Sequence, residues 1–110
     1  MSIKMNNDPK KIKVVIDEDL EDMIPSYLQS CRDNMVIIVQ CLKTNDYAHI
    51  RNIGHDLHGS GASFGFEFIT EAGKQINQGA KNKDHKVITE SITDLETYLN
   101  NLMIDYQSLE

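Results

Sequence analysis

The sequence 24-IPSYLQSCRDNMVIIVQCL-42 predicts the fold class of this chain. Its apolar residues recur at alternating steps of four and three, at Ile24, Leu28, Cys31, Met35, Ile38 and Leu42. This spacing puts one apolar stripe along a helix, as in the seam between the packed helices of a bundle. Because Pro25 suits the first turn of a helix and not its interior, we expect a long helix over 25–43.

A second seam of the same kind lies near the end of the chain. Its members again step by four and three, at Ile88, Ile92, Leu95, Leu99, Leu102 and Tyr106. This seam predicts a last helix over 84–107, and two shorter apolar patterns predict helices over 46–63 and 66–79. Four helices with short connections predict an all-α protein that folds as an antiparallel, up-down four-helix bundle.

The segment before the first seam is less regular. Residues 1–13 are polar and lack periodicity, so we expect a flexible leader followed by a single domain over 14–110. The apolar run 14–16 would need a partner to be a strand, and we expect it to lie extended on the helical core. The acidic residues 17–19 favour the start of a short extra helix over 17–24.

Length and composition describe one small acidic domain. The chain has 110 residues and a formal net charge of −6, and its basic residues are scattered, so no nucleic acid is expected as a partner. The sequence has no apolar stretch of membrane-spanning length and no secretory signal at its start. Cys31 and Cys41, predicted on one helix, would be about 15 Å apart along its axis, too far for a disulfide. Free buried cysteines are typical of the reducing cytoplasm, where we expect a monomer.

The stretch 54-GHDLHGSGASFG-65 is unusual for a helix. It holds four of the six glycines of the chain, although a glycine costs a helix interior about 1 kcal/mol relative to alanine. At about 100° per residue, Gly54 and Gly61 face the core, where they would allow close helix packing. His55 points roughly 120–140° away from that face, and Gly59, one turn later, would leave open space beside its ring.

The string His55-Asp56-Leu57-His58-Gly59-Ser60, followed by Gly65 and a further helix, resembles the phosphoacceptor motif of histidine phosphotransfer (HPt) domains, His-x-Leu-Lys-Gly-Ser. The predicted order of helices also agrees with that family over about 15–107. The resemblance implies that His55 accepts a phosphoryl group from an aspartyl phosphate of a response-regulator receiver domain and passes it to another receiver. A hybrid histidine kinase is a further candidate partner.

The resemblance also implies what the chain does not do by itself. Members of the family have no autonomous ATP-dependent kinase activity, and no cofactor of its own is expected, because Mg²⁺ belongs to the partner receiver. Residues near His55 are candidates for steadying the phosphate or giving access to the ring: His58, Gly59, Arg51, Asn52 and Lys74. His58 stands where the family usually has lysine, so its positive charge depends on pH.

Two aromatic residues and a serine follow the motif. Ser60 falls on the core side of the helix, where we expect it to hydrogen-bond the backbone. Phe64 and Phe66 flank Gly65, and we expect them in the core, with an exposed docking patch as the alternative.

Two other functions remain open from the sequence. A helical interaction module without phosphotransfer would have the same bundle, although His55 and Gly59 would then have no purpose. A metal-binding bundle could use His55 and His58 with carboxylates, but neither belongs to a Glu-x-x-His motif, so no metal ligand is predicted. His49 and His85 are interpreted as ordinary surface residues.

Overall fold

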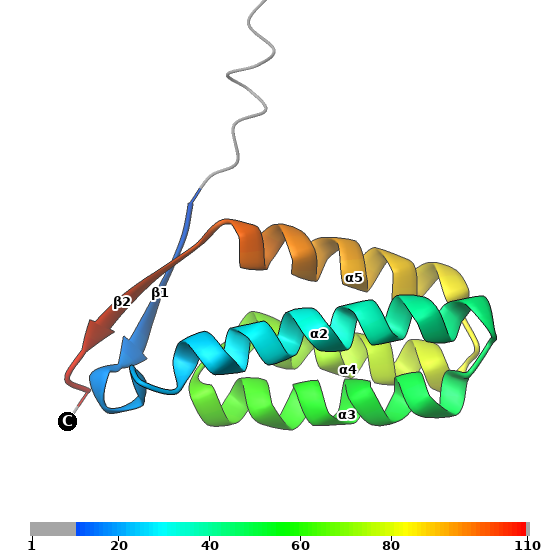
Figure 1. Cartoon of the computed structure of the whole chain (residues 1–110), viewed down its shortest axis with the longest axis horizontal. Coiled ribbons are helices and arrows are strands. Elements are labelled where there is room, and N and C mark those ends of the chain that lie inside the picture. The colour runs from blue at the N-terminus through cyan, green and yellow to red at the C-terminus, as the bar shows by residue number, and fades with distance from the viewer. Residues whose placement is uncertain (1–10, 110) are drawn as a thin grey trace, which may run out of the picture.

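Residues 11–109 are described by a computed structural model, and in them four α-helices form the body of the molecule (Figure 1). The helices are α2 (Ile24–Lys43), α3 (Tyr47–Phe64), α4 (Glu67–Lys81) and α5 (His85–Asn100). Strand β1 (Ile12–Asp17) and a 3₁₀ turn, η1 (Glu18–Leu20), precede them, and strand β2 (Leu102–Gln107) follows them. The chain is therefore mostly helical, as predicted, with a small addition of β-structure.

Consecutive helices run in opposite directions along the bundle (Figure 1). The contacts between α3 and α4 show this, because Gly54 lies against Asn77 whereas Gly61 lies against Thr70. Residue numbers thus fall along α4 as they rise along α3. The four helices enclose one core that is rich in isoleucine, with Ile24, Ile38, Ile50, Ile69, Ile76 and Ile88 buried alongside Leu57 and Leu95.

The helix ends follow from local chemistry. The Asp46 carboxylate accepts a hydrogen bond from a backbone N–H in the first turn of α3, and Asp84 does the same for α5, which satisfies donors that the helix leaves free. Gly65 ends α3 in the left-handed conformation, with φ of 90°, which glycine adopts without strain. The starts and ends of α2, α3 and α4 agree with the predicted ranges to within two residues.

The last helix is shorter than predicted. The seam predicts a helix over 84–107, but α5 ends at Asn100 and the chain continues as β2. The side-chain amide of Asn101 donates to a backbone carbonyl one turn earlier at 2.7 Å and closes the helix. Half-buried and exposed residues then alternate along β2. Leu102 and Tyr106 fit a helical spacing of four, yet they also lie on one face of a strand.

The N-terminal segment also differs from the prediction. β1 pairs in parallel with β2, with Ile12 opposite Leu102 and Ile16 opposite Tyr106, so the apolar run 14–16 belongs to a strand after all. A parallel partner at the other end of the sequence leaves no local signal, which is why it was not expected. The predicted all-α class is therefore confirmed for the four helices, and the two short strands are an addition that it did not include.

The expected short helix over 17–24 is reduced to η1, a single turn that Asp17 caps. β1 begins at Ile12, two residues before the predicted start of the domain, and residues 1–10 of the predicted leader lie outside the described part of the chain. Cys31 and Cys41 are both buried on α2 and unpaired, as predicted. Among residues 11–109, no helix has the length and apolar content needed to cross a bilayer.

Candidate functional site

Three glycines bring α3 and α4 unusually close together. A Cβ added to Gly54 would lie 2.7 Å from the backbone N of Asn77, and one added to Gly61 would lie 2.6 Å from the backbone N of Thr70. A Cβ on Gly73 of α4 would collide with the backbone N of His58. Backbone therefore packs directly on backbone, and the predicted packing role of Gly54 and Gly61 is confirmed. The close contact makes α3 a rigid support for the residues on its other face.

His55 and Gly59 lie on that other face of α3. Both are exposed, in agreement with the helical geometry of the sequence. Apart from the backbone of its own helix, a Cβ added to Gly59 would meet nothing within 4 Å in the described part of the chain. Gly59 thus differs from the other glycines of α3, because packing does not explain it. One turn beyond His55, it leaves the space beside the imidazole open to solvent.

His58 is held against α4. Its Nδ1 lies 3.2 Å from the backbone carbonyl oxygen of Thr70. Because a carbonyl oxygen only accepts hydrogen bonds, Nδ1 must carry the proton in this contact. Neutral His58 then has an unprotonated Nε2, which accepts hydrogen bonds and cannot donate to an anion. Only the protonated ring of His58 has a second N–H that can donate to an anion. This limit follows from the contact with Thr70, which the sequence did not predict.

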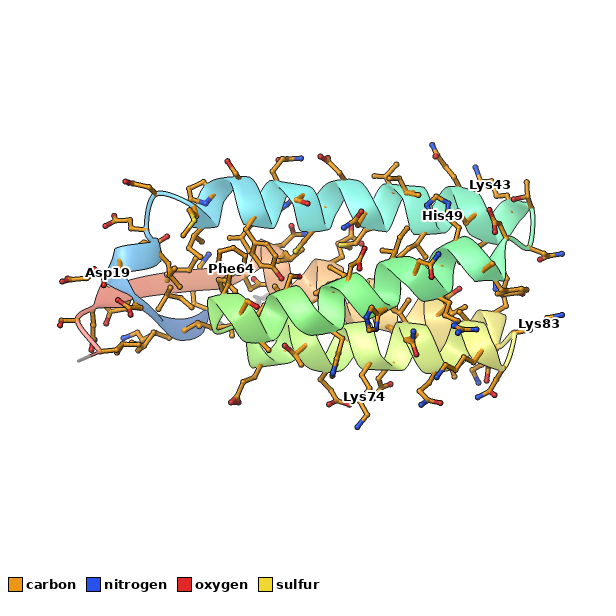
Figure 2. The ribbon with its side chains drawn as sticks, turned by 90° about the horizontal axis from the view of Figure 1, so that it is seen from below. Asp19, Lys43, His49, Phe64, Lys74 and Lys83 are labelled. Atoms are coloured by element: carbon orange, nitrogen blue, oxygen red, sulfur yellow. The ribbon has the colours of Figure 1, made fainter. Side chains whose placement is uncertain are left out.

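The remaining predicted residues are exposed on α3 and α4. Arg51 and Asn52 lie within the turn before His55, and the Arg51 backbone carbonyl accepts a hydrogen bond from Asn77 Nδ2 at 3.0 Å. Lys74 extends outward from α4 about midway along the bundle (Figure 2). In residues 11–109 the one ion pair joins His49 and Asp46, so Arg51 and Lys74 have no carboxylate partner there.

Aromatic side chains support the end of α3 that follows the motif. The rings of Phe64 and Tyr27, which lies on α2, stack with centroids 4.4 Å apart, and Phe66 is fully buried beside them. Figure 2 places Phe64 between α2 and α3. Ser60 makes the predicted backbone bond, to the Leu57 carbonyl, and its hydroxyl is also 2.9 Å from the Tyr27 hydroxyl. The core prediction is confirmed for Phe66, whereas Phe64 is only half-buried.

One cleft of the molecule lies away from His55. It has a volume of about 660 Å³ and opens between β1, the start of α4 and the end of α5, where Val14, Phe68 and Tyr98 line it. None of the predicted site residues borders it. His55 and His58 also belong to no group of three potential metal ligands among residues 11–109. His55 is thus an exposed imidazole on the surface of α3, next to the open position at Gly59.

Comparison with protein families matches residues 19–104 of this chain to the Hpt domain. The chain therefore belongs to the Hpt domain family, whose members are phosphocarrier modules of histidine phosphotransfer in phosphorelays and lack kinase activity of their own. No curated protein and no solved structure matches the chain. The resemblance in the sequence is thus confirmed at the level of the family, over all four helices of the bundle.

Proposed function

We propose that His55 is the phosphorylated residue and that the chain carries a phosphoryl group from one receiver domain to another. One observation carries the assignment: His55 is exposed one turn before Gly59, the glycine of α3 whose Cβ position is open. The other glycines of the segment are explained by packing or by the turn at Gly65. A surface cleared beside a single imidazole is what a second protein needs to reach it.

The reaction needs little machinery from this chain. An unprotonated nitrogen of the His55 ring attacks the phosphorus of a receiver's aspartyl phosphate, a nitrogen–phosphorus bond forms, and the aspartate oxygen leaves with the electron pair. The reverse exchange delivers the group to the aspartate of a second receiver. Phosphoryl transfer depends mainly on positioning and charge stabilisation, and a helix fixed by the α3–α4 contact supplies the positioning. Mg²⁺ would come with the receiver.

The charges around His55 support a phosphate there. Arg51 and Lys74 have no carboxylate partner among the described residues, so both are available to a dianionic phosphoryl group. His58 adds a positive charge only when its ring is protonated, because its Nδ1–H is already donated to the Thr70 carbonyl. Asn52 is a neutral donor on the same turn as Arg51. We infer that these residues steady the phosphohistidine and that Gly59 gives access to it.

The test is transfer from labelled receivers. Receiver domains from the same genome are phosphorylated on aspartate with a radioactive small-molecule donor and then mixed with wild-type protein or with His55→Gln. We expect label on the wild type that is labile to acid and stable to alkali, as a phosphoramidate is, and none on the variant. Label that persists on His55→Gln would refute the site.

A matched control separates the site from histidine chemistry in general. His85 is also exposed on a helix but lies on α5, so His85→Gln should accept label as the wild type does. If folded wild-type protein bound the receivers yet acquired no label from any of them, the interaction module without phosphotransfer would be the better description.

A further inference from the structure

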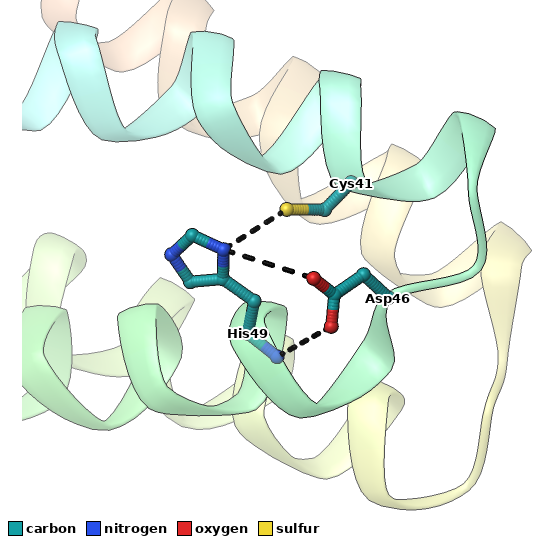
Figure 3. Close-up of side chains that lie close together, drawn as sticks. All are labelled: Cys41, Asp46 and His49. Atoms are coloured by element: carbon teal, nitrogen blue, oxygen red, sulfur yellow. Dashed lines mark hydrogen bonds and ion pairs between the residues drawn. The ribbon is translucent and has the colours of Figure 1, made fainter.

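A second cluster of side chains, all of them possible metal ligands, lies at the end of the bundle away from the strands. Cys41 comes from the last turn of α2, Asp46 from the connection, and His49 from the first turn of α3 (Figure 3). The His49 Nδ1 lies 3.4 Å from the Cys41 Sγ and 3.9 Å from an Asp46 carboxylate oxygen. The three ligand atoms all lie within 4.8 Å of one another. A thiol, a carboxylate and an imidazole therefore lie close together at one point of the bundle.

The arrangement differs from that of a catalytic triad. In a triad the histidine uses one ring nitrogen for the nucleophile and the other for the carboxylate. Here the thiol and the carboxylate both face the same nitrogen, Nδ1, so that His49 cannot relay a proton from Cys41 while Asp46 orients it. Three donors that share one point are suited to hold a single ion.

The sulfur–nitrogen spacing agrees with that expected around zinc, and the carboxylate lies somewhat farther out. Zinc–sulfur bonds of about 2.3 Å and zinc–nitrogen or zinc–oxygen bonds of about 2.0–2.2 Å, at tetrahedral angles, separate the ligand atoms by roughly 3.4–3.6 Å. The observed sulfur–nitrogen distance of 3.4 Å falls in that range, and the nitrogen–oxygen distance of 3.9 Å exceeds it slightly. The Asp46 side chain is half-exposed and can close the difference with a small movement.

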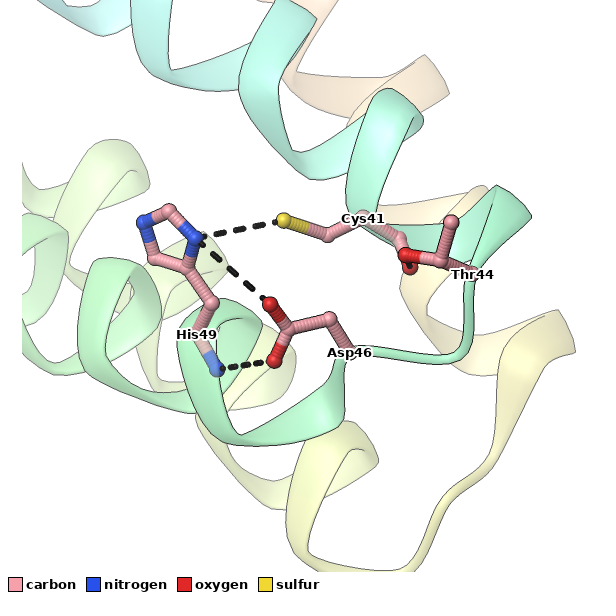
Figure 4. Close-up of polar contacts among 4 residues, drawn as sticks. All are labelled: Cys41, Thr44, Asp46 and His49. Carbon is pink, nitrogen blue, oxygen red and sulfur yellow. Dashed lines mark hydrogen bonds and ion pairs between the residues drawn. The ribbon is translucent and has the colours of Figure 1, made fainter.

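Two hydrogen bonds order the helix ends from which the three ligands come. The other Asp46 oxygen accepts the backbone N–H of His49 at 3.1 Å, which fixes the carboxylate at the start of α3. The Thr44 hydroxyl donates to the Cys41 carbonyl at 3.3 Å and orders the end of α2 (Figure 4).

We infer that Cys41, Asp46 and His49 bind one zinc ion. The Cys41 thiolate and the Asp46 carboxylate supply two negative charges that balance the ion, and the neutral His49 ring supplies the third ligand. Binding forms a zinc–sulfur bond and releases the thiol proton to solvent. The half-exposed His49 and Asp46 leave the fourth position to water, as in zinc sites that exchange a ligand.

Because zinc binds the thiolate and not the thiol, zinc binding should depend on pH, and acid should release the ion. Thiolate and imidazole ligands select zinc and cobalt over magnesium and calcium, which prefer oxygen. Zinc would join the end of α2 to the start of α3.

Binding can be measured on the whole chain without any phosphotransfer partner, so the result is independent of the role of His55. Metal-free, reduced protein is titrated with zinc in competition with a chromophoric chelator, and with Co²⁺ to detect a thiolate-to-cobalt charge-transfer band. We expect one ion per chain, a cobalt–thiolate band, a higher melting temperature with zinc, and no such effect of Mg²⁺. Absence of stoichiometric binding would overturn the inference.

Variants identify the ligands. His49→Ala and Cys41→Ser should each weaken zinc binding by at least about tenfold and the latter should abolish the cobalt–thiolate band. Asp46→Asn keeps a side-chain acceptor for the start of α3 and should weaken binding while the helices remain intact by circular dichroism. Cys31→Ser and His85→Ala are the matched controls and should bind as the wild type does. Equal affinity in wild type and His49→Ala, an exposed position that tolerates change, would refute the site.

Discussion

At the scale of single residues, the glycines around His55 have two different roles, helix packing and access to the imidazole ring. Gly54 and Gly61 are buried against α4, whereas Gly59 faces solvent with open space where a Cβ would stand. The sequence predicted this division, because helical geometry alone assigns each glycine a face. The hydrogen-bond partner of His58 could not be predicted from the sequence. That partner is the backbone carbonyl of Thr70, and every residue has such a carbonyl, whatever its side chain.

The identity of residue 58 should set how the phosphohistidine responds to pH. His58 can donate to the phosphoryl group only when protonated, whereas lysine carries its charge throughout the neutral range. We expect the half-life of phosphorylated His55 to depend less on pH in His58→Lys than in wild type, compared at pH 6 and pH 8. One exposed charge-assisted hydrogen bond limits the difference to roughly tenfold. The same pH dependence in both proteins would show that His58 does not contact the phosphate.

At the scale of elements, the α3–α4 contact and the strand pair show where sequence patterns succeed and fail. Helices α2 to α4 were predictable to within two residues, because each carries its own apolar stripe and end signals. The end of α5 was not, since Leu102 and Tyr106 satisfy both a helical and a strand spacing. The deciding contact, the pairing of β2 with β1, lies far away in the sequence. The periodicity of apolar residues describes local structure and gives no information about partners that are distant in the sequence.

The α3–α4 contact makes the same substitution have opposite effects at two glycines. Gly59→Ala should raise the free energy of unfolding by about 0.5–1 kcal/mol, because alanine favours the helix and its Cβ meets open space. Gly73→Ala should lower it by about 1–3 kcal/mol, because the added Cβ overlaps the backbone of α3. Urea denaturation of both variants at one pH gives the comparison. If Gly59→Ala and Gly73→Ala changed the free energy of unfolding by similar amounts in the same direction, α3 and α4 would not be in backbone contact.

At the scale of the whole molecule, the core holds its ionisable groups in the protonated form. Burial raises the pKa of Tyr27 and of both cysteines, Cys31 and Cys41, and raises that of Tyr98 to about 12. The same groups in an unfolded chain would ionise at ordinary values of 9.0 for cysteine and 10.0 for tyrosine. The folded protein therefore keeps protons that the unfolded chain releases in alkaline solution.

Stability should consequently fall as the pH rises above about 9. In the folded state Tyr27, Tyr98 and the two cysteines keep their protons to a higher pH than in the unfolded chain. Each unit of pH between the unfolded and folded pKa therefore favours the unfolded chain by up to about 1.4 kcal/mol per group. Tyr98→Phe removes one such group and should give a shallower decline between pH 10 and pH 11 in urea denaturation. A decline as steep as that of the wild type would show that Tyr98 ionises equally in both states.

The pairing of β1 with β2 also bears on the order in which the chain folds. Ile12 and Leu102 lie ninety positions apart in the sequence, whereas only residues 65 and 66 separate α3 from α4. Closing a long loop costs more entropy than closing a short one, and local contacts form faster than distant ones. The hairpin of α3 and α4 can thus assemble early, with His55 already on its surface. We expect the pairing of β1 with β2 to form last, after the helices between the two strands have packed.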